Sequence, residues 1–207
     1  MVDSKKEYRT LPMTELQSRM ESDGKPVIEG HAAVFDSWSE TLGGFFPFKE
    51  KVRTGAFSKS IGKDDIRALF NHDANHVLGR NRAGTLELAE DEKGLLVRIY
   101  PPDTQWARDL QTSIGRGDIT QMSFGFTVEK DEWNTEEGVD TRELVEVKLF
   151  DVSPVTFPAY TATDVGVRAH EAYKAEVRLR ADAEDKAARD AKERLKQRNR
   201  LTKFKIL

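Results

Sequence analysis

The chain has 207 residues, enough for one domain of ordinary size plus an appendage, and it carries a net charge of −3. It contains no cysteine, which excludes disulfides, a thiolate nucleophile and thiolate metal ligands. No apolar run follows the N-terminal lysines, so we expect no secretory signal, and no stretch approaches the roughly 18 apolar residues of a membrane span.

The net charge conceals a division along the chain. Residues 168–207 contain 13 Lys and Arg against 7 Asp and Glu, a balance of +6. The totals of 33 basic and 36 acidic residues therefore leave 20 against 29 in residues 1–167, a balance of −9. An acidic body with a basic tail is consistent with a solvated tail helix, or with a tail that docks on an acidic partner or nucleic acid.

The first part of the chain is expected to form short strands separated by loops. Runs of apolar residues at alternate positions, interrupted by glycines, give the boundaries. We expect strands near residues 8–16, 27–35 and 46–52, a short helix over 56–61, and a strand over 66–71 that carries His72 at its end.

A hairpin and a helix are expected next. Strands over 85–89 and 95–100 are separated by a short acidic segment that Gly94 closes. Two prolines end the second strand, and Asp103 then resembles an N-cap residue. Apolar residues recur at helical spacing from Trp106 to Ile114, so this segment predicts a helix that Gly115 stops.

The following strand, residues 119–128, contains the most informative residue, Ser123. Apolar side chains alternate along it and define one face, so Ser123 and Gly125 share the other face. A small nucleophile beside a glycine is expected to leave open space for a substrate backbone. Another apolar strand is expected over 143–150.

The composition changes near residue 165. Ala, Glu, Lys and Arg dominate from there on, which predicts a long exposed helix. We therefore expect a body over residues 1–164 and a charged helical tail over 165–207. The body predicts an α+β, strand-rich fold, a mostly antiparallel barrel or sandwich with helices on its outside.

Four histidines limit the search for a general base. His31 lies in an apolar strand and His170 in the predicted tail helix, which favours a structural and a solvated role for them. His72 and His76 are four residues apart, as in a metal pair on a helix, but their segment does not look helical and no cysteine is present. His72, at the end of a strand, is better held than His76, which we place in a turn.

A serine, a histidine and an acid are the parts of a serine hydrolase. The pattern of residues alone does not decide the acid. Asp151 follows a predicted strand, and three other carboxylates remain open for the same role: Glu143, Glu146 and Asp140.

Several short motifs occur in a defined order along residues 8–162. They are Gly30–Phe35, Gly55–Phe57, Leu69–Asp73 leading to Leu78–Arg80, Gly84–Leu86, Gly94–Leu95, Arg116–Ile119 running into Met122–Phe126, and Asp151–Ala159. With these motifs the chain resembles the prohead (procapsid) maturation proteases of tailed bacteriophages, in the branch related to the herpesvirus capsid-assembly protease.

The resemblance implies a serine endopeptidase with His72 as general base, Ser123 as nucleophile and Asp151 as the third member. Family members commonly have glutamate at that third position, so this chain has a side chain that is one methylene shorter. The implied fold is a closed β-barrel wrapped by helices. No cofactor or metal is expected. Two pairs of adjacent residues are candidates for the oxyanion hole: Arg116 with Gly117, and Gly79 with Arg80.

The resemblance also implies partners and a location. The family acts in the host cytoplasm, inside the assembling procapsid, on scaffold or the scaffold-like segment of the major capsid protein, and often on itself. A homo-oligomer is possible, while no membrane and no specific nucleic acid are expected. We hypothesise that the tail, residues 165–207, binds scaffold and is removed by self-cleavage; an oligomerisation helix or a linker is the alternative.

The sequence is also compatible with two other classes of function. One is a non-catalytic scaffold or assembly protein with a protease-like fold, for which Ser123→Ala would change nothing. The other is a hydrolase of small esters or amides, although the chain lacks the Gly-x-Ser-x-Gly elbow of α/β-hydrolases around Ser123. No glycine-rich loop has the spacing of a nucleotide-binding P-loop.

Overall fold

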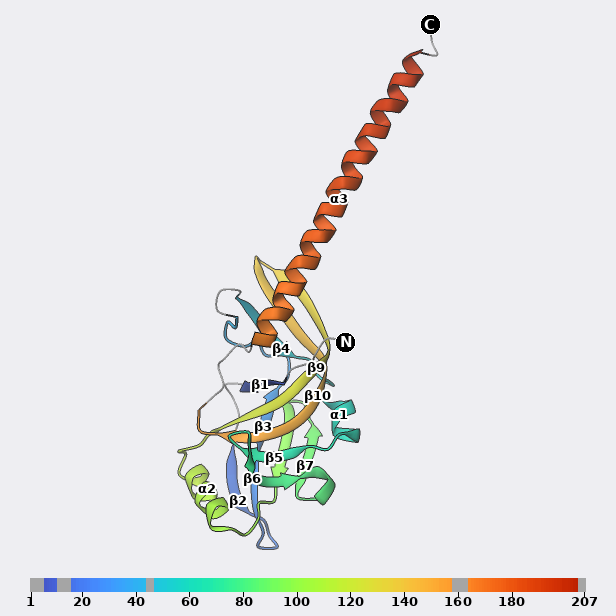
Figure 1. Ribbon diagram of the computed structural model, residues 1–207. Coiled ribbons are helices and arrows are strands. Elements are labelled where there is room, and N and C mark those ends of the chain that lie inside the picture. The colour runs from blue at the N-terminus through green and yellow to red at the C-terminus, as the bar shows by residue number, and fades with distance from the viewer. Residues whose placement is uncertain (1–5, 11–15, 44–46, 158–163, 205–207) are drawn as a thin grey trace. The chain divides into compact units, whose positions relative to one another are not determined.

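The structure, a computed structural model, describes residues 6–10, 16–43, 47–157 and 164–204. The chain separates into two compact units, residues 1–166 and 167–207. The first unit holds the described strands and the shorter helices, and the second is part of one long helix (Figure 1). The division lies two residues beyond the change in composition expected at 164 and 165.

The first unit is built mainly from strands. In chain order its elements are β1 (Glu7–Thr10), β2 (Gln17–Met20), β3 (Pro26–Val34), β4 (Phe48–Val52), α1 (Ser58–Lys63), β5 (Arg67–Phe70), β6 (Asp73–Arg80), the short helix η1 (Asn81–Ala83), β7 (Leu86–Glu90), β8 (Gly94–Ile99), α2 (Gln105–Gly115), β9 (Gln121–Glu136) and β10 (Val139–Val155).

These strands form two sheets. The six-stranded sheet has the order β1-β9-β10-β5-β6, with β4 also paired to β10. The four-stranded sheet has the order β2-β3-β8-β7. A shared hydrophobic core includes Phe124 and Phe126 of β9, Ile28 of β3 and Val97 of β8, all fully buried. Apolar residues at alternate positions of β8 and β9 supply much of this core, as the sequence predicts for these strands.

The described strands do not form the closed barrel that the resemblance implied. A closed barrel needs two hydrogen-bonded neighbours for every strand. In the described residues, β1 and β6 are edges of the larger sheet, and β2 and β7 are edges of the smaller one. The strand-rich α+β class is confirmed, whereas the closed barrel that the resemblance implied is not found in the described residues.

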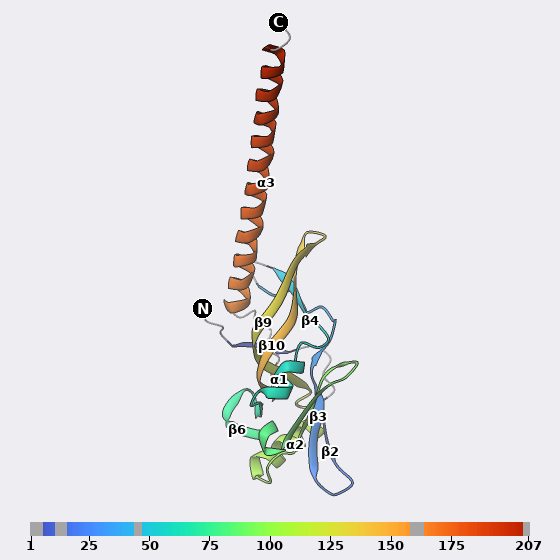
Figure 2. The same cartoon turned by 90° about the vertical axis from the view of Figure 1, so that its right-hand side faces the viewer.

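The hairpin of β9 and β10 is much longer than either strand expected from the sequence. Its two strands can be followed in Figures 1 and 2 as one long, curved ribbon. The pairing register shifts at three places, between Leu144 and Glu146, between Glu146 and Val147, and between Leu149 and Asp151. Such bulges bend a strand and increase its twist, so one hairpin contributes to the sheet along a curved path.

Strand β6 is an element that the sequence analysis did not predict. The sequence analysis placed His76 in a turn, but the turn consists of Asn71 and His72, because Phe70 pairs directly with Asp73. Both turn residues have positive φ, 53° and 58°, as the two central residues of a type I′ hairpin turn require. His76 therefore lies in a strand, and His72 lies in the turn rather than at the end of β5.

The remaining predicted elements agree with the structure to within a few residues. Strand β1 corresponds to the start of the strand expected over 8–16, and residues 11–15 lie outside the described residues. Helix α2 has Thr104 as its N-cap residue, so the N-cap expected at Asp103 is wrong by one position. Helix α3 (Asp164–Phe204) agrees with the expected tail helix, and its described side chains are mostly exposed.

Among the described residues, no helix combines the length and the apolar character needed to cross a membrane.

Candidate active site

Three side chains from separate elements form a hydrogen-bonded series. The Ser123 Oγ of β9 lies 2.8 Å from Nε2 of His72, which is in the β5–β6 turn. The other ring nitrogen, Nδ1, lies 2.5 Å from Oδ1 of Asp151 in β10. The structure thus brings together the three residues that the sequence analysis singled out, in the order hydroxyl, imidazole, carboxylate.

The central position of β10 in the sheet explains how the three meet. Asp151 is opposite Gly125 of β9 on one side and opposite Arg67 of β5 on the other. The turn after β5 therefore carries His72 over the carboxylate, while β9 presents Ser123 two residues from Gly125. The acid and the nucleophile are fixed by one ladder of backbone hydrogen bonds.

The turn that carries His72 is hydrogen-bonded to the end of β10 through Asn71, the residue before His72. The Asn71 backbone N–H donates to the carbonyl of Pro154 at 3.0 Å. Its side-chain amide donates to the Thr156 hydroxyl at 3.1 Å and accepts from the Thr156 N–H at 2.8 Å. These bonds hold His72 in a left-handed backbone conformation, which is uncommon for a non-glycine residue and is found often at functional sites.

Gly125 is needed for a different reason from the one expected. A Cβ atom at this position would collide with the Asp151 carboxylate and would lie 2.9 Å from Cε1 of Tyr8. The space beside Ser123 is therefore filled by the Asp151 carboxylate and by Tyr8 of β1, and the expected room for a substrate backbone stays a prediction. Gly125 makes room for the carboxylate of the series.

A fourth side chain, with a second hydroxyl, belongs to the same cluster. Ser153 is fully buried, its Oγ donates to Oδ1 of Asp151 at 3.1 Å, and it lies 3.3 Å from Nδ1 of His72. It is directly opposite Ser123 in the β9–β10 ladder. The sequence analysis missed Ser153, although its position two residues after Asp151 places both on the same face of a strand.

The N-terminal strand β1 covers the nucleophile. It pairs with β9 so that Thr10 is opposite Ser123 and Tyr8 is opposite Gly125. The Ser123 hydroxyl, which is 0% exposed, donates to the carbonyl oxygen of Arg9 at 2.8 Å. The ring of Tyr8 lies against His72, with centroids 4.3 Å apart. Burial, and then the charge of Asp151, raise the pKa of Tyr8, which keeps its hydroxyl neutral.

A buried cluster of ion pairs holds β1 in place. Arg9 contacts Glu50 of β4 at 2.7 Å and Glu7 at 2.5 Å. Arg142 of β10 contacts Glu50 at 3.0 Å, Glu7 at 3.3 Å and Asp131 at 2.7 Å. All but Asp131 are at most 5% exposed, so each charge depends on its partners rather than on water.

The balance of pKa effects in this cluster favours the charged forms. Burial lowers the pKa of Arg9, but attraction by Glu50 and Glu7 outweighs it, so the net change is upward. Burial raises the pKa of Glu50, but Arg9 and Arg142 outweigh it, so the net change is downward. Both groups are thus ionised, and removing one partner would leave a buried charge without compensation.

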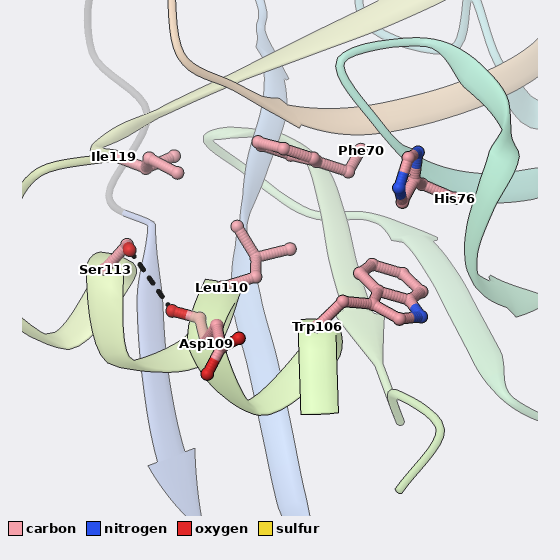
Figure 3. Close-up of a pocket in the computed structure, with 7 residues that line it drawn as sticks. All are labelled: Phe70, His76, Trp106, Asp109, Leu110, Ser113 and Ile119. Carbon is pink, nitrogen blue, oxygen red and sulfur yellow. Dashed lines mark hydrogen bonds between the residues drawn. The ribbon is translucent and has the colours of Figure 1, made fainter. Parts of the chain in front are cut away.

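The second histidine of the pair, His76, lies elsewhere. Its Nδ1 is 2.7 Å from Oδ2 of Asp73, and its ring packs edge-on against Trp106 with centroids 5.1 Å apart. Figure 3 shows it at the rim of a cavity of about 260 Å³ beside α2, lined by Phe70, His76, Trp106, Asp109, Leu110, Ser113 and Ile119. None of the Ser123, His72 and Asp151 series lines this cavity.

The other acids and the other candidate donors have partners of their own. Glu143 pairs with Arg53, Glu146 with Lys59, and Asp140 with the Thr135 hydroxyl. Among the oxyanion candidates, the amide of Arg116 donates to Thr112, that of Gly117 to Ile114 and that of Arg80 to Thr85, while Gly79 pairs with Ala68 in the β5–β6 ladder. Their role in an oxyanion hole stays a prediction.

Comparison with known proteins identifies the family of the chain. A protein-family model described as caudovirus prohead serine protease matches residues 14–178, which is most of the chain. The chain belongs to the caudovirus prohead serine protease family. The chain is also 30% identical over 158 residues to the prohead protease of Enterobacteria phage HK97, a match that covers 73% of this chain and 64% of the relative.

One solved structure was also found to be similar. The capsid assembly protease of bacteriophage T4 matches with a TM-score of 0.45 and 13% sequence identity, over 75% of this chain and 99% of that one. The family assignment rests on the sequence matches.

Proposed function

We propose that this member of the prohead serine protease family is a serine endopeptidase with Ser123 as nucleophile, His72 as general base and Asp151 as the orienting acid. The observation that carries the proposal is the hydrogen-bonded series from Ser123 Oγ through both ring nitrogens of His72 to Asp151 Oδ1, at 2.8 Å and 2.5 Å. Such a series is recognised by geometry and roles rather than by sequence position.

The chemistry follows from these groups. Nε2 of His72 takes the hydroxyl proton while Ser123 Oγ attacks the carbonyl carbon of a peptide bond. Asp151 holds the imidazole and stabilises its cationic form, and the imidazolium then gives the proton to the leaving amine. Water hydrolyses the acyl-enzyme by the same route. Backbone N–H donors stabilise the oxyanion, each worth about 10²–10³ in rate.

We further propose that the chain cleaves itself. Its own backbone lies on the nucleophile, because Ser123 donates to the carbonyl of Arg9 across an antiparallel ladder. Adding a strand to the edge of a sheet is a general mode of peptide binding. An extended substrate must displace β1, so removal of this strand is the step that exposes Ser123.

The proposed setting is procapsid maturation. The proposed substrates are scaffold or the scaffold-like segment of the major capsid protein, cleaved inside the assembling procapsid in the host cytoplasm. The proposal for the tail is that residues 165–207 bind an acidic partner such as scaffold, since residues 168–207 carry a balance of +6. If a chain truncated at residue 165 were packaged as well as the full chain, the role of the tail in targeting would be wrong.

The first experiment is co-expression with the cognate capsid protein, read by intact mass. Wild type, Ser123→Ala and a control, Ser113→Ala, are compared. The control removes a hydroxyl of α2 that donates only to the Asp109 carbonyl. Shortened capsid protein or shortened protease with wild type and the control, but not with Ser123→Ala, supports the endopeptidase.

The non-catalytic scaffold is the second candidate, and one observation favours it: Ser123 is fully buried. It predicts identical masses for all three chains, also when shells assembled with scaffold are added. An enzyme that awaits assembly would produce fragments at that point.

A further inference from the structure

We propose that Glu50 forms a specificity site for a basic side chain on the substrate residue whose carbonyl is attacked. This inference rests on the proposed endopeptidase function and adds the class of bond that the enzyme selects. It treats β1 as a substrate segment bound in cis.

The register of β1 identifies the bond presented to the nucleophile. The carbonyl oxygen that meets Ser123 Oγ, at 2.8 Å, belongs to Arg9, so Arg9 occupies the place of the acyl residue. Tyr8, the residue before it, packs on the ring of His72. Attack would form a bond from Ser123 Oγ to the Arg9 carbonyl carbon and break the bond to the Thr10 nitrogen, which receives the proton from His72.

The Arg9 side chain occupies a built site. Its Nε lies 2.7 Å from Oε1 of Glu50 and its Nη2 lies 3.3 Å from Oε2, so the carboxylate binds the planar guanidinium at two points. The guanidinium also lies over the ring of Phe126, 5.6 Å from its centroid. Arg9 is 5% exposed and Glu50 is 3% exposed, so water does not screen this contact.

Charge determines what can replace Arg9 when β1 leaves. Displacement of β1 removes Glu7 and Arg9 from the cluster. Arg142 then remains paired with Glu50 and Asp131. One positive and two negative charges leave a balance of −1 around Glu50, which shares its remaining partner Arg142 with the partly exposed Asp131. A buried charge without compensation is costly, so a lysine or arginine side chain of the substrate fits this site and an acidic one is repelled.

The test measures how fast Ser123 of the full chain is labelled by phosphonate probes. Peptidyl diphenyl phosphonates, which form an Oγ–P bond and release phenoxide, are made with an arginine-like, a leucine-like or a glutamate-like side chain beside phosphorus. A small fluorophosphonate without such a side chain reports whether Ser123 is activated at all. All probes compete with β1 for the same site, so the fraction of chains with β1 displaced cancels from the ratio of their rates.

Four chains are compared: wild type, Arg9→Gln, Glu50→Gln and the control Glu143→Gln. Arg9→Gln frees the Glu50 carboxylate, and Glu143→Gln removes a carboxylate that pairs with Arg53 and Lys51 outside the cluster. We expect the arginine-like probe to label wild type and Arg9→Gln about 10-fold to 100-fold faster than the leucine-like probe, the range for charge-assisted hydrogen bonds. Glu50→Gln should reduce this ratio to about one, and Glu143→Gln should leave it unchanged.

The outcomes separate the inference from the proposed function. Labelling by the fluorophosphonate with no preference for the arginine-like probe, in wild type and Arg9→Gln, overturns the specificity site and leaves the endopeptidase standing. No labelling of either chain by any probe, also after shells assembled with scaffold are added, overturns the endopeptidase and the inference with it. Because wild type alone can show the preference or its absence, the test does not depend on folding of Glu50→Gln.

Discussion

The Ser123 hydroxyl and the Arg9 carbonyl oxygen, 114 positions apart in the chain, are joined by a 2.8 Å hydrogen bond. The hydroxyl has one proton, and Nε2 of His72 also lies 2.8 Å from the Ser123 Oγ. A proton donated to Arg9 is not available to His72. The strand that contains Arg9 therefore both covers the nucleophile and competes for its proton.

Weakening the anchors of β1 should expose the nucleophile. Replacing Glu7 and Arg9 together by Gln removes both β1 charges from the buried cluster with Arg142 and Glu50. Each buried charged hydrogen bond is worth about 1.5–3 kcal/mol, so we expect labelling of Ser123 by a fluorophosphonate to become at least about 10-fold faster. Arg19→Gln, which removes an exposed ion pair in β2, is the control. Equal rates for the double variant and wild type would show that β1 does not limit access.

Loss of the Ser153 hydroxyl should weaken catalysis without changing the fold. Ser153 donates to the Asp151 oxygen that also faces His72. Without this donor the Asp151 carboxylate is held less firmly against the imidazole, so we expect Ser153→Ala to lower kcat about 10-fold. Ser153→Thr, which keeps a hydroxyl, should recover most of the rate. An unchanged kcat in Ser153→Ala would show that the hydroxyl only fills space.

Gly125→Ala should be far more damaging than an alanine at another glycine. The new methyl group would collide with the Asp151 carboxylate and crowd Tyr8. We expect at least about a 100-fold loss of kcat from the displaced acid, and a loss of about 1–3 kcal/mol in the free energy of unfolding. Gly115→Ala is the matched control, because a Cβ there has no neighbour within 4 Å. Steady-state kinetics and urea unfolding test both parts.

The β5–β6 hairpin that carries His72 should respond to acid through Asp65. A hydrogen bond from Arg80, at the end of β6, lowers the pKa of Asp65 to about 2, and Arg67 contributes further. A carboxyl with a lower pKa in the folded than in the unfolded chain stabilises the fold above the unfolded pKa of about 3.9. That contribution is lost as the pH falls toward 2.

The measurement for this prediction is the urea midpoint at pH 7, 4 and 2.5. Asp65→Asn should lower the midpoint at pH 7 and should remove part of the fall that wild type shows between pH 4 and 2.5. Asp118→Asn is the control, since Asp118 pairs with Arg116 after α2 rather than in this hairpin. Parallel pH dependence of wild type and Asp65→Asn would contradict the prediction.

Much of the site could be predicted because it depends on local pattern. Alternating apolar residues around Ser123 predict a strand with Ser123 on the face opposite the core, and the structure has this arrangement in β9. The ordered motifs directed attention to His72 and Asp151 as well. The turn at Asn71 and His72 was harder to recognise, because Asn, Asp and His near one another are typical of a longer loop.

The sequence by itself determined the strand-rich body and the charged helical tail, because these depend on periodicity and composition. It also singled out Ser123 and His72, whereas Asp151 was implied by the family resemblance and the pattern of residues left four acids open. Only the tertiary structure decided which side chains touch. Pairing of β1 with β9 covers Ser123, and pairing of β10 with β9 places Ser153 and Gly125 around Asp151. Strand pairing joins residues far apart in the chain through backbone hydrogen bonds that any residue except proline can make, so a single sequence carries little signal for it.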